Sequence, residues 1–197
     1  MAEIAGAMLE IEGVRGVSLR LSPGEAVAAV GPPGCGKTAL LRAAAGLDRL
    51  TDGRRTVAAE RIAFVFQQGG LVRNITVADN LLLPLYYQGF SASEAQERAG
   101  AALEAFGLAA VAEQRPGEIV NEARLLAQFA RAAALEAQLL FVDEAFSQLS
   151  KPAAGAAERW LAVEVGKARL AVMMTAVEGL AVPRLPTRIL ELSGAAS

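Results

Sequence analysis

The chain has 197 residues, enough for one domain with a sizeable core. Its 21 acidic and 19 basic residues give a net charge of −2. This balance leaves no excess of positive charge to neutralise a phosphate backbone, so we expect no nucleic acid among its partners.

Apolar residues make up 53% of the chain, but no run of them approaches the roughly 18 to 20 residues that a membrane-spanning helix needs. Glu3 stands where a signal peptide carries lysine or arginine, which favours a cytoplasmic chain. Cys35 is the single cysteine, and the sequence contains no histidine. These facts exclude Ser-His-Asp hydrolases, Cys-His proteases and the usual zinc sites, so catalysis must use carboxylates, a lysine, hydroxyls, backbone amides and an added metal ion.

A glycine-rich pattern occupies residues 31–38, which read Gly-Pro-Pro-Gly-Cys-Gly-Lys-Thr and match G-x-x-x-x-G-K-[ST] at every fixed position. The apolar residues 25–30 predict a buried strand before it, and residues 39–45 predict a helix after it that ends at Gly46. Glycines let backbone amides wrap a phosphate chain at a helix N-terminus. The pattern therefore predicts a phosphate-binding loop rather than a chance glycine-rich turn.

Within this loop, Lys37 is expected to reach the β- and γ-phosphates of a nucleotide, and Thr38 to give its hydroxyl to Mg²⁺. Cys35 is expected to fill space rather than to act as a reactive thiol. The loop alone is compatible with kinases, GTPases, AAA-type machines and transporter ATPases, so later segments have to decide among them.

Two later strands are predicted to end in polar residues. Residues 61–68 read Arg-Ile-Ala-Phe-Val-Phe-Gln-Gln, and residues 139–144 read Leu-Leu-Phe-Val-Asp-Glu. Two carboxylates after an apolar strand place one acid, Asp143, at the water shell of Mg²⁺ and the other, Glu144, beside the attacking water. Since the chain has no histidine, Glu144 is the candidate for positioning or deprotonating that water.

Together these segments resemble the ATP-binding subunit of ABC transporters over nearly the whole chain. Gln67 matches the glutamine of the family's Q-loop, and residues 74–80 resemble the segment that follows it. Residues 145–150 stand where the family has Pro-x-Ser-x-Leu-Asp, and residues 187–194 resemble its closing strand and turn. A small P-loop kinase would leave Gln67 and the acidic strand with its helical lead-in unexplained.

The resemblance implies an α/β fold of the P-loop NTPase class, with residues 1–197 forming a single ABC-type nucleotide-binding domain. Residues 1–66 and 132–197 are expected to form the α/β core, and residues 67–131 the inserted helical subdomain, in which residues 95–106 predict an amphipathic helix. The short segment 52–57 predicts a reduced antiparallel β-subdomain.

The same resemblance implies ATP and Mg²⁺ as cofactors, with Glu144 and Lys37 as catalytic residues and Thr38, Gln67 and Asp143 around the metal. The residues expected to hold the nucleotide are Gly31, Pro32, Pro33, Gly34, Cys35, Gly36, Lys37, Thr38, Ala39, Gln67 and Asp143.

The sequence departs from the family at positions that act across its head-to-tail dimer. The signature Leu-Ser-Gly-Gly-Gln falls on residues 119–123, where Val120 has no hydroxyl and Glu122 is acidic. At an effective dielectric near 20, two unit charges about 4 Å apart repel by roughly 4 kcal/mol, so Glu122 would oppose a γ-phosphate. Ala176 replaces the switch histidine, and Ser150 replaces an aspartate. We expect a subunit that holds Mg-nucleotide but hydrolyses it poorly when paired with itself.

Recognition of the base is expected to be loose. The family stacks adenine on an aromatic side chain before the phosphate loop, and this sequence has no aromatic residue before Phe64.

In this family the groove beside the Q-loop receives a helix from a membrane permease, and residues 69–72 and 80–87 supply an apolar stretch there. Core packing explains the same leucines equally well. The segment Asn-Leu-Leu-Leu-Pro-Leu at residues 80–85 most resembles ATPases of lipid-exporting or Mce-type lipid-transport permeases.

The leading hypothesis is the ATP-binding subunit of an ABC transporter, cytoplasmic and peripheral on the inner face of the cell membrane. Its implied partners are an integral membrane permease and a second ATP-binding subunit, identical or not. The alternative is a non-catalytic nucleotide-binding or scaffold subunit that regulates or completes such a complex.

Overall fold

The computed structural model describes residues 8–179, 183 and 185–192. The N-terminal Glu3 and residues 193–194 of the predicted closing turn lie outside the described residues. The elements in chain order are β1 (Leu9–Val14), β2 (Val17–Leu21), β3 (Ala26–Gly31), α1 (Lys37–Ala45), β4 (Arg54–Val57), β5 (Ile62–Val65), α2 (Val77–Tyr87), α3 (Ala92–Ala105), η1 (Ala109–Val111), α4 (Asn121–Ala134), β6 (Leu139–Asp143), η2 (Ala145–Gln148), α5 (Lys151–Gly166), β7 (Ala171–Val177) and β8 (Arg188–Glu191).

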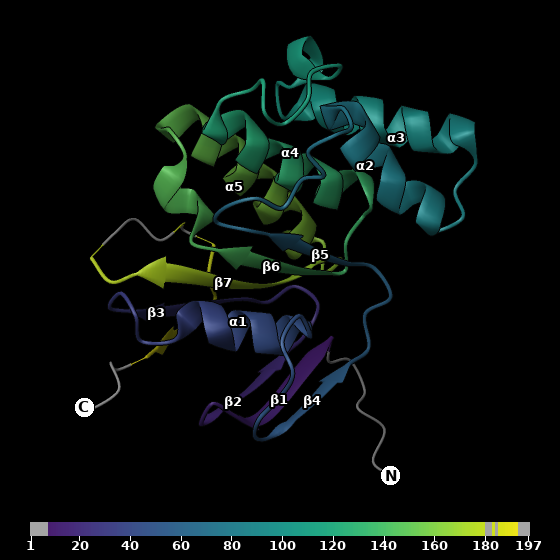
Figure 1. The fold of residues 1–197 in the computed structure, drawn as a ribbon. Coiled ribbons are helices and arrows are strands. Elements are labelled where there is room, and N and C mark those ends of the chain that lie inside the picture. The colour runs from purple at the N-terminus through teal and green to yellow at the C-terminus, as the bar shows by residue number, and fades with distance from the viewer. Residues whose placement is uncertain (1–7, 180–182, 184, 193–197) are drawn as a thin grey trace.

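Two sheets organise the described part of the chain (Figure 1). The larger is a five-stranded parallel sheet in the order β5-β6-β7-β3-β8. In the smaller, three-stranded sheet, β1 pairs antiparallel with both β2 and β4. The parallel α/β core and the small antiparallel sheet expected from the sequence are therefore both present.

The parallel sheet is covered on both faces. Figure 1 shows α2, α3, α4 and α5 on one side of it, and α1 with the antiparallel sheet on the other. The central strands β3, β6 and β7 are therefore buried almost throughout. Burial on both faces explains why these strands are continuous apolar runs rather than alternating ones.

The helical segment is joined to the sheet by α4. Capping boxes precede α2 at Thr76 and α3 at Ser91. In each, the side-chain hydroxyl accepts a hydrogen bond from the backbone amide three residues later. The boundary expected at residue 131 lies inside α4, which continues to Ala134 and packs against α2 and α3 as well as β5. None of the helices within the described residues has the length and apolarity needed to cross a bilayer.

The sheet order decides where the functional residues meet. The carboxyl ends of parallel strands lie at one edge of a sheet, so the loop after β3 and the acids after β6 share that edge. β7 lies between these two strands and pairs Thr175 with Asp143 and Val177 with Gly31. A side chain at the end of β7 can therefore reach both halves of the site.

Candidate functional site

The phosphate-binding loop connects the buried strand β3 to α1. Gly36 is the N-cap of α1 with a φ of 95°, a left-handed conformation that favours glycine. A β-carbon at Gly31 would lie 2.4 Å from the carbonyl oxygen of Leu192 and 2.7 Å from Sγ of Cys35, so a side chain does not fit there. No side chain caps α1, which leaves its first backbone amides available to phosphate oxygens.

The other predicted loop residues lie along the same backbone. Pro33 and Gly34 are exposed at the tip of the loop, and Ala39 is half-buried in the first turn of α1. Sγ of Cys35 lies 4.0 Å from Nζ of Lys37 and faces the inside of the loop.

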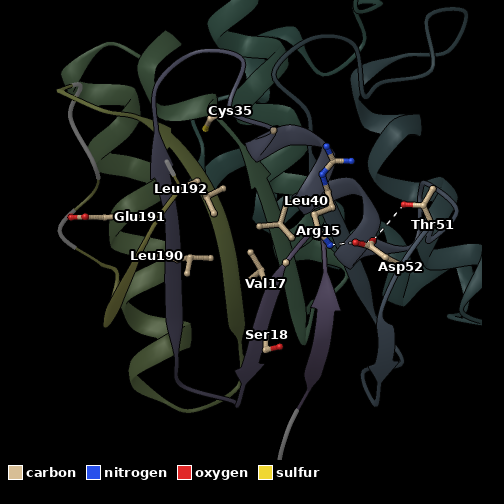
Figure 2. Close-up of a pocket in the computed structure, with 12 residues that line it drawn as sticks. Arg15, Val17, Ser18, Cys35, Leu40, Thr51, Asp52, Leu190, Glu191 and Leu192 are labelled. Atoms are coloured by element: carbon tan, nitrogen blue, oxygen red, sulfur yellow. Dashed lines mark hydrogen bonds between the residues drawn. The ribbon is translucent and has the colours of Figure 1, made fainter. Parts of the chain in front are cut away.

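A cavity of about 730 Å³ adjoins the loop on the side of the antiparallel sheet (Figure 2). Gly36 and Leu40 line it from the loop and α1, Arg15 from the β1–β2 turn, Asp52 from the segment before β4, and Leu190 from β8. The cavity is therefore built from both sheets and opens directly beside the loop.

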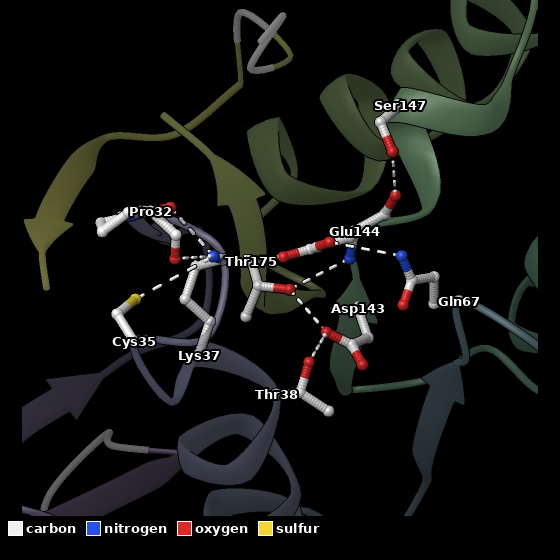
Figure 3. A network of polar contacts seen from close by, with 10 residues as sticks. Pro32, Cys35, Lys37, Thr38, Gln67, Asp143, Glu144, Ser147 and Thr175 are labelled. Atoms are coloured by element: carbon white, nitrogen blue, oxygen red, sulfur yellow. Dashed lines mark hydrogen bonds and ion pairs between the residues drawn. The ribbon is translucent and has the colours of Figure 1, made fainter. Parts of the chain in front are cut away.

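Lys37 extends into the loop and reaches the acidic strand (Figure 3). Only 3% of its side chain is exposed. Its Nζ donates hydrogen bonds of 2.9 Å to the carbonyl oxygens of Gly31 and Pro32, and lies 3.2 Å from Oε1 of Glu144. The ammonium is held between the loop and a carboxylate, where phosphate oxygens would compete with Glu144 for the same charge.

Asp143 is a buried carboxylate at the end of β6. Its Oδ1 accepts a 2.9 Å hydrogen bond from the hydroxyl of Thr38 and a 2.7 Å bond from the hydroxyl of Thr175. The hydroxyl of Thr175 also accepts a 3.0 Å bond from the backbone amide of Glu144. One hydroxyl from β7 therefore fixes both acids, a role that the sequence analysis missed; a lone hydroxyl in an apolar strand was the available signal.

Glu144 adopts a strained backbone conformation, with a φ of 45°. Non-glycine residues in this region cost about 1–3 kcal/mol and occur preferentially at functional sites. Its carboxylate contacts Lys37 through Oε1 and accepts a 3.3 Å hydrogen bond through Oε2 from Nε2 of Gln67. The structure thus brings Lys37, Gln67 and Glu144 together, as Figure 3 shows.

Buried side chains of α4 hold the Q-loop in place. Oε1 of Gln128 accepts a 2.8 Å hydrogen bond from the amide of Phe66, the residue before Gln67. Nη1 of Arg131 donates a 2.7 Å bond to the carbonyl of Gly70, on the other side of Gln67. Burial lowers the pKa of the Arg131 guanidinium from its ordinary value. The sequence analysis did not identify these supports, because their partners are backbone groups of a distant segment.

The donor set fits a magnesium ion that arrives with phosphate. Within the described residues, no group of three or more Asp, Glu, His or Cys side chains is arranged to hold a metal by itself. Thr38 and Asp143 lie in contact, which matches the way Mg²⁺ uses one or two protein ligands together with phosphate oxygens and water. Gln67 contacts Glu144 rather than either of these residues.

The segment at the signature position forms the start of α4. Val120 is the N-cap, has no capping side chain and is 71% exposed. Nδ2 of Asn121 donates a 2.9 Å hydrogen bond to Gln148, and Oε2 of Glu122 accepts a 2.7 Å bond from the amide of Ser150. Hydrogen bonds from the backbone and then the hydroxyl of Ser150 lower the pKa of Glu122. Glu122 is therefore ionised at neutral pH and bonded to its own chain.

Ala176 occupies the position expected for the switch histidine. It follows Thr175 in β7 and lines a small hollow together with Glu144. Its methyl group offers no hydrogen bond to a phosphate.

Comparison with known proteins identifies the family. The model of the family described as ABC transporter matches residues 14–147, which include the loop, the Q-loop and both acids. The chain belongs to the ABC transporter family. Its fold is the ABC-type P-loop fold: the dimeric structure of a bacterial ABC transporter cassette has a TM-score of 0.84 at 22% identity and covers 95% of each chain. The same cassette in a post-hydrolysis state bound to ADP and Pi has a TM-score of 0.83 at 22% identity and covers 94% of each chain.

Curated relatives in the ABC transporter family include two kinds of importer subunit. The sulfate/thiosulfate import ATP-binding protein CysA of Mesorhizobium japonicum is 36% identical over 74% of this chain and 46% of its own length. The Fe(3+) ions import ATP-binding protein FbpC of Brucella suis is 38% identical over 68% of this chain and 40% of its own length. The chain thus spans less than half the length of these relatives. The predicted family and fold class are confirmed, whereas the resemblance to lipid-transport ATPases is not reflected in these names.

The bridging role of Thr175 predicts a specific cost of removing its hydroxyl. In Thr175→Val, the buried Asp143 loses a donor and the amide of Glu144 loses its acceptor, so we expect the free energy of unfolding to fall by about 1–3 kcal/mol. Thr175→Ser keeps the hydroxyl and removes only a methyl group, for which about 1 kcal/mol is expected. Urea unfolding monitored by circular dichroism measures both; a serine variant as unstable as the valine variant would contradict the bridging role.

Proposed function

We propose that this chain is the ATP-binding subunit of an ABC transporter and couples the binding of Mg-nucleotide to transport by a separate membrane permease. The observation that supports the proposal is the convergence of Lys37, Thr38, Gln67, Asp143 and Glu144 at one edge of the parallel sheet. The match to the ABC transporter family over residues 14–147 supports the same conclusion.

Each residue has a distinct role in this proposal. Lys37 and the first amides of α1 bind the phosphates, and Thr38 and Asp143 hold Mg²⁺ directly or through water. The metal neutralises charge on the phosphate oxygens. Glu144 orients the attacking water or accepts its proton, while Gln67 holds the carboxylate from the other side.

We further propose that hydrolysis by two copies of this chain is weak. In a head-to-tail pair of the family type, Val120, Asn121 and Glu122 would face the γ-phosphate of the other copy. Val120 offers no donor, and Glu122 brings a negative charge that its hydrogen bonds keep ionised. Loss of one preorganised donor typically lowers a rate by about 10²- to 10³-fold. A different ATP-binding subunit with an intact signature would make the site on this chain's loop productive.

The docking surface for the permease is proposed on the exposed face of α2. Leu81 and Leu85 of this helix are fully buried, so the predicted alternative of core packing holds for them. Leu83 is 54% exposed, and Tyr86 and Tyr87 are 46% and 89% exposed. The apolar stretch thus has two faces, and the exposed one suits a helix from a cytoplasmic loop of a permease. Binding there would place the subunit on the inner face of the membrane.

Two observations favour different transported substrates. Residues 80–85 support a lipid, through their resemblance to lipid-transport ATPases. The names of the curated relatives support sulfate, thiosulfate or ferric iron. Because selectivity lies in the permease, copurification from the native membrane and identification of the bound permease decides between them.

The alternative is a scaffold subunit that does not hydrolyse ATP. The hydrogen bonds at the start of α4 favour this alternative. Asn121 and Glu122 bond to Gln148 and Ser150 of their own chain. A subunit of this kind would still bind Mg-nucleotide but would regulate an intact ATPase partner. The hydrolysis measurement below separates the two functions.

Removing the charge of Lys37 tests nucleotide binding. A charge-assisted hydrogen bond is worth about 1.5–3 kcal/mol, so Lys37→Ala should weaken Mg-ATP and Mg-ADP binding roughly ten- to hundredfold in titration calorimetry. Lys151→Ala, at an exposed lysine on α5, is the matched control and should bind like the wild type. Glu144→Gln removes the same ion pair but keeps Lys37, so it should bind at least as tightly as the wild type. Absence of wild-type binding at near-millimolar nucleotide would contradict the proposal.

Hydrolysis is expected to depend on the partner. The chain alone should release phosphate at a rate near background, because two copies lack the signature donors. In the complex purified from the native membrane, slow hydrolysis is expected and Glu144→Gln should abolish it. Rapid hydrolysis by the lone chain that disappears in Glu144→Gln would show that this α4 start acts as a working signature.

A charge on the exposed face of α2 tests permease docking. Leu83→Glu should leave the folded structure intact and abolish copurification of the permease. Leu47→Glu is the matched control, because Leu47 is 47% exposed but lies after α1. Thermal unfolding checks that the Leu83→Glu variant is folded, so that lost copurification reports lost docking. Retained copurification by the folded variant would place the permease elsewhere.

A further inference from the structure

A second cavity, of about 570 Å³, opens at the amino ends of the parallel strands. Arg61, Gln138 and Arg169 line it from the segments just before β5, β6 and β7, and Trp160 lines it from α5. These three strands run parallel, so their amino ends share one edge of the sheet and their carboxyl ends the other. The cavity is therefore separated from Asp143 by the whole length of β6, and the nucleotide site does not use it.

Trp160 gives this cavity an aromatic wall. The side chain is half-buried, and the centroid of its ring lies 5.9 Å from that of Phe106 and 6.5 Å from that of Phe129. The indole is thus held by the hydrophobic core while it lines the cavity. Met8 and Ala137 add further apolar wall, so the apolar part of a ligand would meet mainly carbon atoms here.

The side chains of the lining that lack a partner all present hydrogen-bond donors. Within the described residues, no hydrogen bond or ion pair engages the guanidinium of Arg169, and no hydrogen bond engages the indole nitrogen of Trp160. Oε1 of Gln138 accepts two backbone amides at 2.9 and 3.2 Å, which leaves its NH₂ group to donate. In the same part of the chain, Arg61 donates only through Nε, at 3.0 Å to the carbonyl oxygen of Glu136. A ligand that fits these groups has to supply acceptors.

The charge balance favours an anion. The carboxylates of Glu136 and Glu164 are paired with cations outside the lining, Arg98 at 2.9 Å and Lys167 at 3.7 Å. The two arginines of the lining have no acidic partner among the described residues, so these four cations and two carboxylates sum to +2. The carboxyl ends of α4 and α5 adjoin the cavity and offset about half a charge each, which leaves about one positive charge.

We propose that this cavity binds a small organic carboxylate with an apolar body. The carboxylate lies on the guanidinium groups of Arg61 and Arg169, and the body packs against Trp160. A carboxylate has only acceptors, pairs with guanidinium groups through two parallel bonds, and carries the single negative charge that the site balances. The cavity has the size of small-molecule sites, which span about 300–1,000 Å³. The inference goes beyond the proposed function and does not depend on nucleotide binding.

Trp160 reports binding directly, because the chain has no other tryptophan. Four probes are titrated at constant ionic strength: cyclohexanecarboxylate, its neutral amide, cyclohexylmethylammonium and acetate. The first three share the apolar ring and differ in the head group, whereas acetate keeps the head and lacks the ring. None of them absorbs where tryptophan is excited, so the emission of Trp160 stays measurable. Titration calorimetry measures the same affinities without relying on the emission.

Variants at Arg169 separate its charge from its shape. Arg169→Gln removes the charge of a guanidinium that supports no other described residue, so the fold should be unchanged, and Arg169→Lys keeps the charge. Arg159→Gln is the matched control. Arg159 is exposed on α5 next to Trp160, and its Nη1 lies 3.3 Å from the position that a β-carbon on Gly155 would take, away from the lining of the cavity.

We expect cyclohexanecarboxylate to change the emission of Trp160 saturably, with a dissociation constant of about 1 mM or below, and the other three probes to bind roughly tenfold or more weakly. Arg169→Gln should weaken the carboxylate about tenfold, Arg169→Lys less, and Arg159→Gln not measurably.

Three outcomes would overturn the inference. One is a wild type that gives neither an emission change nor heat with cyclohexanecarboxylate up to about 20 mM. The others are equal affinity for any of the other three probes and wild-type affinity in Arg169→Gln. None of the probes carries phosphate, so each of these results would leave the proposed function intact.

Discussion

The site depends on one constraint of the sheet: β7 lies between the strand that carries the phosphate loop and the strand that carries the acids. The strands β3 and β6 therefore do not pair with each other, and the loop and the acids meet across the end of a third strand. On that third strand, the hydroxyl of Thr175 donates to Asp143 and accepts from the amide of Glu144, and Asp143 accepts from Thr38 of the loop side. The ion pair between Lys37 and Glu144 closes the same gap at the level of the side chains.

A second constraint comes from α4, which serves two parts of the molecule. Its buried middle, through Gln128 and Arg131, fixes the backbone on either side of Gln67. Its exposed start, through Asn121, bonds to Gln148, whose own amide donates to the carbonyl of Gln67. The Q-loop is therefore held from the middle of α4 and, through Gln148, from its start, so polar contacts as well as packing tie the helical subdomain to the edge of the sheet that carries the site.

Much of the fold and part of the site could be predicted from the sequence because they depend on local patterns. The loop is a fixed spacing of glycines, Lys37 and Thr38, and the acids follow an unmistakably apolar strand. The supports of the site are different in kind. Thr175 bonds to a backbone amide 31 positions away, and Gln128 to one 62 positions away. No pattern of spacing in the sequence indicates such a partner. The pairing of Glu122 with Ser150 likewise depends on how α4 and α5 meet.

The packing at Gly31 makes the loop dependent on an edge strand of the sheet. β8 has four residues and, within the described part of the chain, pairs only with β3. The carbonyl oxygen of Leu192, just after this strand, lies 2.4 Å from the position that a β-carbon on Gly31 would take, so only glycine fits there. Segments at the margin of a fold, with few buried contacts, open locally at a lower free energy than global unfolding requires. Fraying of the sheet margin would therefore loosen the loop at its first residue, and amide hydrogen exchange in β3 and β8 would rise together.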